Sequence, residues 1–142
     1  MQEQLRLREI EVVVDLGPEE PVVSGNAIQL EQVFLNLLTN ARDAVMAKDS
    51  GARRIVVHAR RGTPGNLEIA VEDNGCGVDP QNLEKIFQLG FTTKTEGNGL
   101  GLHFSACAAL ELHGKLTARS EGLGHGASFL LELPFEAAAA AA

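Results

Sequence analysis

Three features are scarce in this sequence of 142 residues: cysteine, long apolar runs and excess positive charge. The two cysteines, Cys76 and Cys107, lie far apart without metal-ligand spacing, so we expect reduced thiols in a cytoplasmic protein. No apolar run approaches the length of a membrane span, and we expect neither a signal peptide nor membrane contact. The net charge of −7 argues against non-specific binding to nucleic acid.

The sequence does contain enough apolar residues for one domain, since 44% of the chain is hydrophobic. We expect this domain to cover residues 10–135. Residues 1–9 are interpreted as the end of a linker from an upstream region. Residues 136–142 consist of one glutamate followed by alanines, and we interpret them as a low-complexity tail outside the fold.

The most informative stretch is residues 73–77, Asp-Asn-Gly-Cys-Gly, which follows an alternation of apolar and polar residues over 67–72. Such alternation predicts a half-buried strand, and its parity places Asp73 on the buried face. A buried carboxylate is costly unless it accepts hydrogen bonds, so Asp73 is predicted to be an acceptor in a pocket. The alternative is an Asn-Gly hairpin turn. The chain instead continues into a helical pattern over residues 83–87.

The clearest predicted element is a helix that begins near Asn26. Its apolar stripe is formed by Leu30, Val33, Phe34, Leu37, Leu38, Ala41 and Val45. Asn36, Asn40 and Asp43 follow one border of this stripe at spacings of four and three residues, so they share one side of the helix. Asparagine is a mediocre helix former, and two of them in this position suggest ligands. Capping of neighbouring loops is the alternative, and Gly51 is the expected helix stop.

Four further segments have the apolar patterns of strands, namely residues 10–16, 54–60, 115–120 and 127–133. The second of these has a polar outer face, on which His58 is interpreted as a surface residue. In the last strand, Phe129, Leu131 and Leu133 are expected to face the core.

Residues 97–102, Gly-Asn-Gly-Leu-Gly-Leu, lead into a helix predicted to run through Leu112. The residues at helical spacing there are Phe104, Cys107, Ala108 and Glu111. A glycine-rich turn at a helix start presents unpaired N–H groups that can hold a phosphate. Many such turns are only tight turns, but this one follows a loop carrying Lys94, whose charge can reach a phosphate. Residues 89–98 have no apolar period, and their glycines lower the cost of moving, so we expect a mobile segment.

Taken together, four motifs in order resemble the catalytic ATP-binding domain of sensor histidine kinases, in the superfamily of gyrase, Hsp90 and MutL. The motifs are Asn36-Leu-Leu-Thr-Asn40-Ala-Arg-Asp43, residues 73–77, Phe87 with Phe-Thr-Thr-Lys at 91–94, and residues 97–102. The resemblance covers residues 5–135. It implies an α/β fold of two layers, the Bergerat fold, in which helices cover one face of a mixed sheet beside a flexible ATP lid.

The resemblance also implies roles for individual residues. Asn40 would bind Mg²⁺ through its amide oxygen, Asn36 would support the phosphates, and Asp73 would accept from the adenine amino group. Asn36, Asn40 and Lys94 would be the catalytic residues. The implied ATP-binding set is Asn36, Asn40, Asp43, Asp73, Gly75, Gly77, Val78, Ile86, Phe91, Thr92, Thr93, Lys94, Gly97, Asn98, Gly99, Leu100, Gly101 and Leu102.

Two departures from the family pattern shape the functional hypothesis. Related ATP hydrolases place a glutamate general base four residues before the metal-binding asparagine, and here that residue is Asn36. Sensor kinases phosphorylate a histidine on a helical hairpin, and no histidine of this chain lies in that acceptor pattern. The implied reaction is transfer of the ATP γ-phosphoryl group to a separate dimerisation and phosphotransfer domain, with a response regulator as indirect partner. An ATP hydrolase and a non-catalytic nucleotide-binding module are the alternatives.

Overall fold

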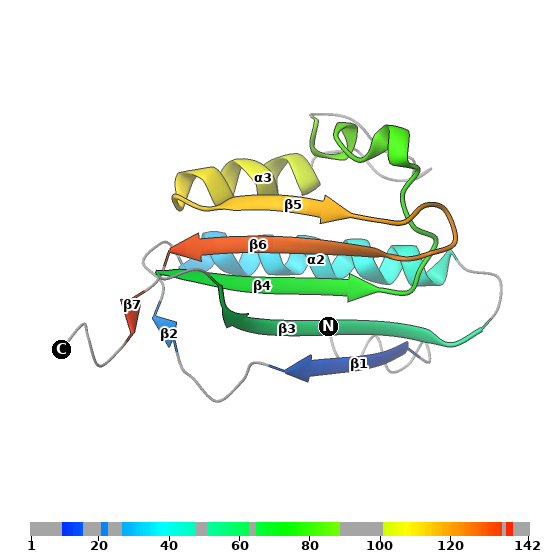
Figure 1. Ribbon diagram of the computed structural model, residues 1–142, viewed down its shortest axis with the longest axis horizontal. Helices are drawn as coiled ribbons and strands as arrows, with labels where there is room; N and C mark the ends of the chain where they lie inside the picture. The colour runs from blue at the N-terminus through cyan, green and yellow to red at the C-terminus, as the bar shows by residue number, and fades with distance from the viewer. Residues whose placement is uncertain are drawn as a thin grey trace.

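The structure, a computed structural model, describes residues 10–15, 21–22, 27–47, 51–62, 65–88, 101–134 and 136–137. Within them a five-stranded sheet in the order β1-β3-β4-β6-β5 lies against two helices (Figure 1). The elements are β1 (Ile10–Asp15), β2 (Pro21–Val22), α2 (Ala27–Met46), β3 (Arg53–Arg61), β4 (Asn66–Asp73), the 3₁₀ turns η1 (Pro80–Asn82) and η2 (Lys85–Phe87), α3 (Gly101–Glu111), β5 (Lys115–Arg119), β6 (Ala127–Pro134) and β7 (Glu136–Ala137). Because β1 pairs with β3 in parallel and the other neighbours are antiparallel, the predicted mixed sheet is confirmed.

The two faces of the sheet differ in chemistry because side chains alternate along each strand. The face toward the helices holds the core, in which Phe129, Leu131 and Leu133 are fully buried as predicted. The opposite face carries cross-strand ion pairs, which suit a solvated surface. These pairs are Arg60–Glu68 and Lys115–Glu132, with N–O distances of 3.0 and 3.3 Å, and on the same face the His58 Nε2 lies 3.3 Å from a Glu72 carboxylate oxygen.

Helix α2 buries the predicted stripe against the sheet and crosses behind β4 and β6 (Figure 1). Val33, Leu37, Ala41 and Val45 have no exposed surface, which follows from their spacing of about one turn. The helix ends at Met46, several residues before Gly51, so the expectation that Gly51 stops it is wrong. Gly51 instead adopts a positive φ of 94° in the turn that leads to β3.

Helix α3 buries only one of the four residues that the sequence placed at helical spacing, Ala108. Phe104, Cys107 and Glu111 are exposed, and the buried side is formed by Ser105, Ala108, Ala109 and Leu112. Small side chains on this side allow the helix to lie close to its neighbours, α2 and β5. The sequence did not indicate the other buried positions, because small buried residues differ little from exposed ones in hydrophobicity.

Two further expectations required correction. The helical pattern over residues 83–87 contains only the short 3₁₀ turn η2. It follows a second 3₁₀ turn, η1, in which the Asp79 side chain accepts the Gln81 N–H. The segment interpreted as a tail beyond residue 135 begins with β7, whose Glu136 and Ala137 pair with Val22 and Pro21. The fold thus extends at least to residue 137. Among the described residues, no helix has the length and apolarity to cross a membrane.

Candidate functional site

The polar border of α2 connects two places where other segments approach this helix closely. Near its C-terminal end, a Cβ atom on Gly75 would lie 2.4 Å from the Ala44 carbonyl carbon. Further back along the helix, Asn36 contacts Gly101 at the start of α3. Eight residues of α2 separate these contacts, about 12 Å along the helix axis. A ligand that reaches both places would therefore have to span about 12 Å.

At the first end, strand β4 delivers Asp73 onto the core-facing side of the sheet, as its parity predicted. The residue is only 8% exposed, and one carboxylate oxygen, Oδ1, accepts the Gly75 N–H at 2.8 Å. The other oxygen, Oδ2, is buried as well. An ionised carboxylate can only accept hydrogen bonds, so this position favours a ligand that presents donors.

The hairpin alternative for residues 73–77 is wrong. After Asp73 the chain passes to η1 rather than returning as a paired strand. The Asn74 side chain bonds the backbone at the start of β3, accepting from the Arg54 N–H at 2.8 Å and donating to the Ala52 carbonyl at 3.0 Å. The segment is thereby tied to the sheet in a conformation that leaves Asp73 facing inward.

The glycines beside Asp73 are required by protein contacts. Gly75 lies directly against the α2 backbone, and the next residue, Cys76, donates its N–H to the Ala44 carbonyl at 3.0 Å. That carbonyl belongs to the last turn of the helix, where such groups need partners from outside. The sequence suggested that Gly75 and Gly77 leave space for a flat ligand. The structure gives each a sufficient reason in packing, and a contact with the ligand stays a prediction.

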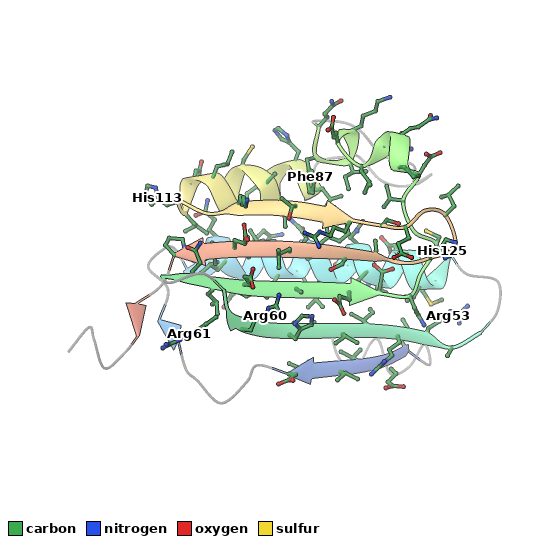
Figure 2. All side chains as sticks on the ribbon, in the orientation of Figure 1. Arg53, Arg60, Arg61, Phe87, His113 and His125 are labelled. Atoms are coloured by element: carbon green, nitrogen blue, oxygen red, sulfur yellow. The ribbon has the colours of Figure 1, made fainter. Side chains whose placement is uncertain are left out.

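The loop between β5 and β6 completes this end of the site, which we call the glycine wall: residues 73–78 together with 120–126. A Cβ atom on Gly77 would lie 2.2 Å from the Gly122 carbonyl oxygen, and Gly77 has a φ of 75°. The Gly124 N–H bonds the Cys76 carbonyl at 2.7 Å, and the Gly126 N–H bonds the Gly75 carbonyl at 3.2 Å. His125 marks this end of the sheet, with His113 at the opposite end (Figure 2).

Ser120 and Val78 add a side-chain contact to the wall. The Ser120 hydroxyl accepts the Val78 N–H at 3.0 Å and donates to the Gly126 carbonyl at 2.7 Å. Sequence analysis placed Val78 in the site but assigned nothing to Ser120. Its only signal in the sequence was a hydroxyl at the end of a predicted strand beside a glycine-rich loop.

At the other end, the three polar residues of the α2 border have different environments. Asn36 donates from Nδ2 to the Gly101 carbonyl and to the Ser105 hydroxyl, each at 3.3 Å. Asp43 forms an ion pair with its neighbour Arg42 at 3.4 Å. Asn40 is half-buried, and its amide has no hydrogen-bond partner among the residues that the structure describes. Within the described part of the chain, the amide donor and the oxygen of Asn40 are thus both available to a ligand.

Several predicted site residues lie in the core or outside the described residues. Ile86 is buried, and Leu102 packs partly against the same core, so their side chains contribute to the fold. Eight predicted residues fall outside the described part: Phe91, Thr92, Thr93, Lys94, Gly97, Asn98, Gly99 and Leu100.

The side chains at the site can be compared with the ligands that a metal ion requires. Within the described ranges, no three His, Cys, Asp or Glu side chains gather as a metal centre. Mg²⁺ does not require one, because it prefers oxygen ligands and retains waters, completing its shell with the phosphates of a nucleotide. A single amide oxygen from Asn40 fits that requirement.

Comparison with known proteins identifies related families and folds. Residues 25–137 match the family model described as histidine kinase-, DNA gyrase B-, and HSP90-like ATPase. The chain is 45% identical to the two-component sensor PprA of Pseudomonas aeruginosa, across 98% of this chain and 15% of PprA. It is 34% identical to the signal transduction histidine-protein kinase AtoS of Escherichia coli, across 88% of this chain and 20% of AtoS. The chain thus spans a minor part of these relatives.

Solved structures agree with the sequence comparison. The mycobacterial sensor histidine kinase MprB superposes with a TM-score of 0.81 and 27% identity, covering 96% of this chain and 90% of that one. The nucleotide-free catalytic domain of histidine kinase ThkA gives a TM-score of 0.80 and 25% identity, covering 94% and 85%. Full-length ShkA in complex with AMPPNP gives 0.79 and 28%, covering 96% of this chain and 28% of that one. The two-layer α/β fold is therefore shared with these proteins.

Proposed function

The chain belongs to the family of histidine kinase-, DNA gyrase B- and HSP90-like ATPases, and we propose that it is the ATP-binding catalytic domain of a two-component sensor histidine kinase. In this proposal it transfers the γ-phosphoryl group of ATP to a histidine on a separate helical hairpin. The observation that carries the proposal is the buried Asp73 carboxylate, fixed by the Gly75 N–H beside the glycine wall. An acceptor of this kind suits the exocyclic amino group of adenine and disfavours guanine, which has a carbonyl oxygen there.

The α2 border supports the phosphate end of the same proposal. Asn40 would hold Mg²⁺ through its amide oxygen, and when bound the ion would neutralise charge on the phosphates. Asn36 and Asp43 would flank it on the same side of the helix. Lys94 and the glycines of residues 97–101 remain the proposed partners of the triphosphate. Phosphoryl transfer of this type needs positioning and charge compensation with little covalent chemistry from the protein.

The geometry of Asn36 favours transfer over hydrolysis. Hydrolysis requires a water that is positioned and deprotonated, and an amide cannot accept a proton at neutral pH. The Asn36 nitrogen is, in addition, engaged with Gly101 and Ser105. A histidine imidazole is already a nucleophile near neutral pH and needs only alignment with the γ-phosphoryl group.

The test compares two reactions of the isolated chain. We expect slow ATP turnover alone and phosphate transfer when a purified acceptor hairpin is supplied, measured with radiolabelled ATP. Asn36→Glu, which introduces a carboxylate at the position of the general base in related hydrolases, tests whether turnover is limited by the missing base. Brisk turnover by the wild-type chain without transfer to the hairpin would favour an ATP hydrolase. Nucleotide binding without either reaction would favour a non-catalytic module.

The wider setting of the domain is part of the proposal. The dimerisation and phosphotransfer region of the parent kinase would be its direct partner, and a response regulator its indirect one. We place the domain in the cytoplasm, where ATP is available and where the free thiols of Cys76 and Cys107 would stay reduced.

A further inference from the structure

A triangle of hydrogen bonds joins α2 to the first turn of α3. Its members are the Asn36 amide, the Ser105 hydroxyl and the Gly101 carbonyl. The Asn36 Nδ2 donates to both other groups at 3.3 Å, and the Ser105 Oγ donates to the Gly101 carbonyl at 2.9 Å. Ser105 has no exposed surface, so no water can replace its partners. Removing one member of this triangle leaves its buried partners without a hydrogen bond, which is costly.

The chemistry of the triangle fixes the orientation of the Asn36 amide. The Gly101 carbonyl can only accept hydrogen bonds, and the Ser105 hydroxyl already uses its single hydrogen on that carbonyl. Both groups therefore require a donor from Asn36, and the amide nitrogen must face α3. Within the described part of the chain, the amide oxygen Oδ1 accepts from the Gln32 Nε2 at 3.5 Å, the limit of a hydrogen bond.

We propose that Ser105 is a positioning residue of the nucleotide site, which acts by holding the Asn36 amide in one orientation and by holding the start of α3 against α2. The proposal rests on the proposed function, because the group that Ser105 orients belongs to the proposed ATP site. Without the Ser105 hydroxyl, Asn36 keeps only one of its two acceptors on α3, and its oxygen samples more orientations. The polar border of α2 then presents a less fixed surface to the nucleotide.

The first experiment measures ATP affinity by calorimetry, in the presence of Mg²⁺, for wild type, Ser105→Ala, Asn36→Ala and the double variant. Loss of one hydrogen bond predicts an affinity about three- to tenfold weaker for Ser105→Ala. If Ser105 acts through Asn36, Ser105→Ala has no further effect in the Asn36→Ala background. An unchanged affinity in the single variant, or the same loss in both backgrounds, overturns the proposal.

A matched control separates positioning from general loosening of α3. Ala109 is fully buried on the same helix and takes no part in the triangle. Ala109→Gly weakens the helix through backbone entropy, and we expect it to change ATP affinity less than twofold. If Ala109→Gly weakens affinity as much as Ser105→Ala does, Ser105 has only a structural role. Should Ser105→Ala fail to fold, Ser105→Cys keeps the volume with a poor donor and is expected to show the same loss.

A second measurement needs no nucleotide and so distinguishes failure of this inference from failure of the proposed function. In the free protein, the two side-chain amide protons of Asn36 should shift in nuclear magnetic resonance spectra on Ser105→Ala, and much less on Ala109→Gly. Unshifted signals would overturn the inference that Ser105 orients the Asn36 amide. Shifted signals in a protein that binds no ATP would support that inference and reject the proposed function.

Discussion

The two ends of the α2 border are built by different means. At the Asp73 end, backbone lies against backbone, with Gly75 on α2 and Gly77 on the β5–β6 loop, and no side chain fits between them. At the Gly101 end, the join consists of side-chain hydrogen bonds from Asn36 and Ser105. Backbone contacts at van der Waals distance do not adjust, whereas amide and hydroxyl groups can change partners.

This difference corresponds to the two parts of the proposed ligand. An adenine is the same before and after transfer, so the rigid end can hold it without change. The phosphate end must accommodate a triphosphate, then a diphosphate, and an incoming acceptor between them. Substitutions that add a Cβ atom between the closely packed backbones of the rigid end should therefore act through folding. Substitutions of the polar side chains at either end test binding, and they affect folding only where the side chain also holds another segment.

The largest effect is expected from Gly77→Ala. The new Cβ would meet the Gly122 carbonyl at 2.2 Å, and the positive φ adds strain, so we expect a loss of roughly 3 kcal/mol or more in unfolding free energy. Gly124→Ala in the adjoining loop is the control, because its φ of 84° is similar but open space surrounds the position. It should cost only about 1–2 kcal/mol. Urea unfolding checks both, and equal losses would show that the wall is not tightly packed.

The next largest effect tests whether Asp73, at the rigid end, binds the nucleotide. Asp73→Asn should leave the fold largely intact, because the amide oxygen can still accept the Gly75 N–H. It should weaken ATP binding by about 1.5–3 kcal/mol, ten- to hundredfold, since a charged acceptor is lost. Glu72→Gln is the same chemical change on the opposite, exposed face and should leave affinity unchanged. Calorimetry on a folded Asp73→Asn chain with wild-type affinity would remove Asp73 from the site.

The smallest effect on stability distinguishes the two asparagines of the border. Asn40 has no partner among the described residues, so Asn40→Ala should raise the unfolding free energy by about 0.5 kcal/mol through helix propensity. It should also reduce the dependence of ATP affinity on Mg²⁺. Asn36→Ala should instead lower stability by about 1–2 kcal/mol, because the Ser105 and Gly101 groups lose their donor. A stability loss for Asn40→Ala would indicate a structural role.

The sequence predicted those parts of the molecule that depend on local periodicity. Alternation along β4 placed Asp73 inside, and helical spacing placed Asn36 and Asn40 at the edge of a buried stripe, because each pattern is set by residues next to one another. On α3 the sequence indicated Ala108, but the buried Ala109 was missed because small residues differ little from exposed ones in hydrophobicity. Ser105 was missed for the same reason.

Contacts between segments that are far apart in the sequence could not be predicted from local patterns either. The pairing of β7 with β2 brings together nearly opposite ends of the chain, and two-residue strands have no pattern of their own. The reason for Gly75 was invisible as well, since the backbone that excludes a side chain there belongs to Ala44. The glycine-rich motif indicated a close contact of the backbone at these positions, but it did not indicate which segment or ligand makes that contact.

The glycine wall has a consequence for how the protein is made. Its first half, residues 73–78, leaves the ribosome long before its second half, residues 120–126, and the hydrogen bonds of Gly75 and Cys76 to Gly126 and Gly124 connect the two. At roughly 5–20 residues per second, the nascent chain carries the first half of the wall for several seconds before the second half is made. Such non-local pairing is also slow to form. A nascent chain that stops before residue 120 therefore contains every residue of the polar α2 border, and Asp73 as well, yet lacks the second half of the wall.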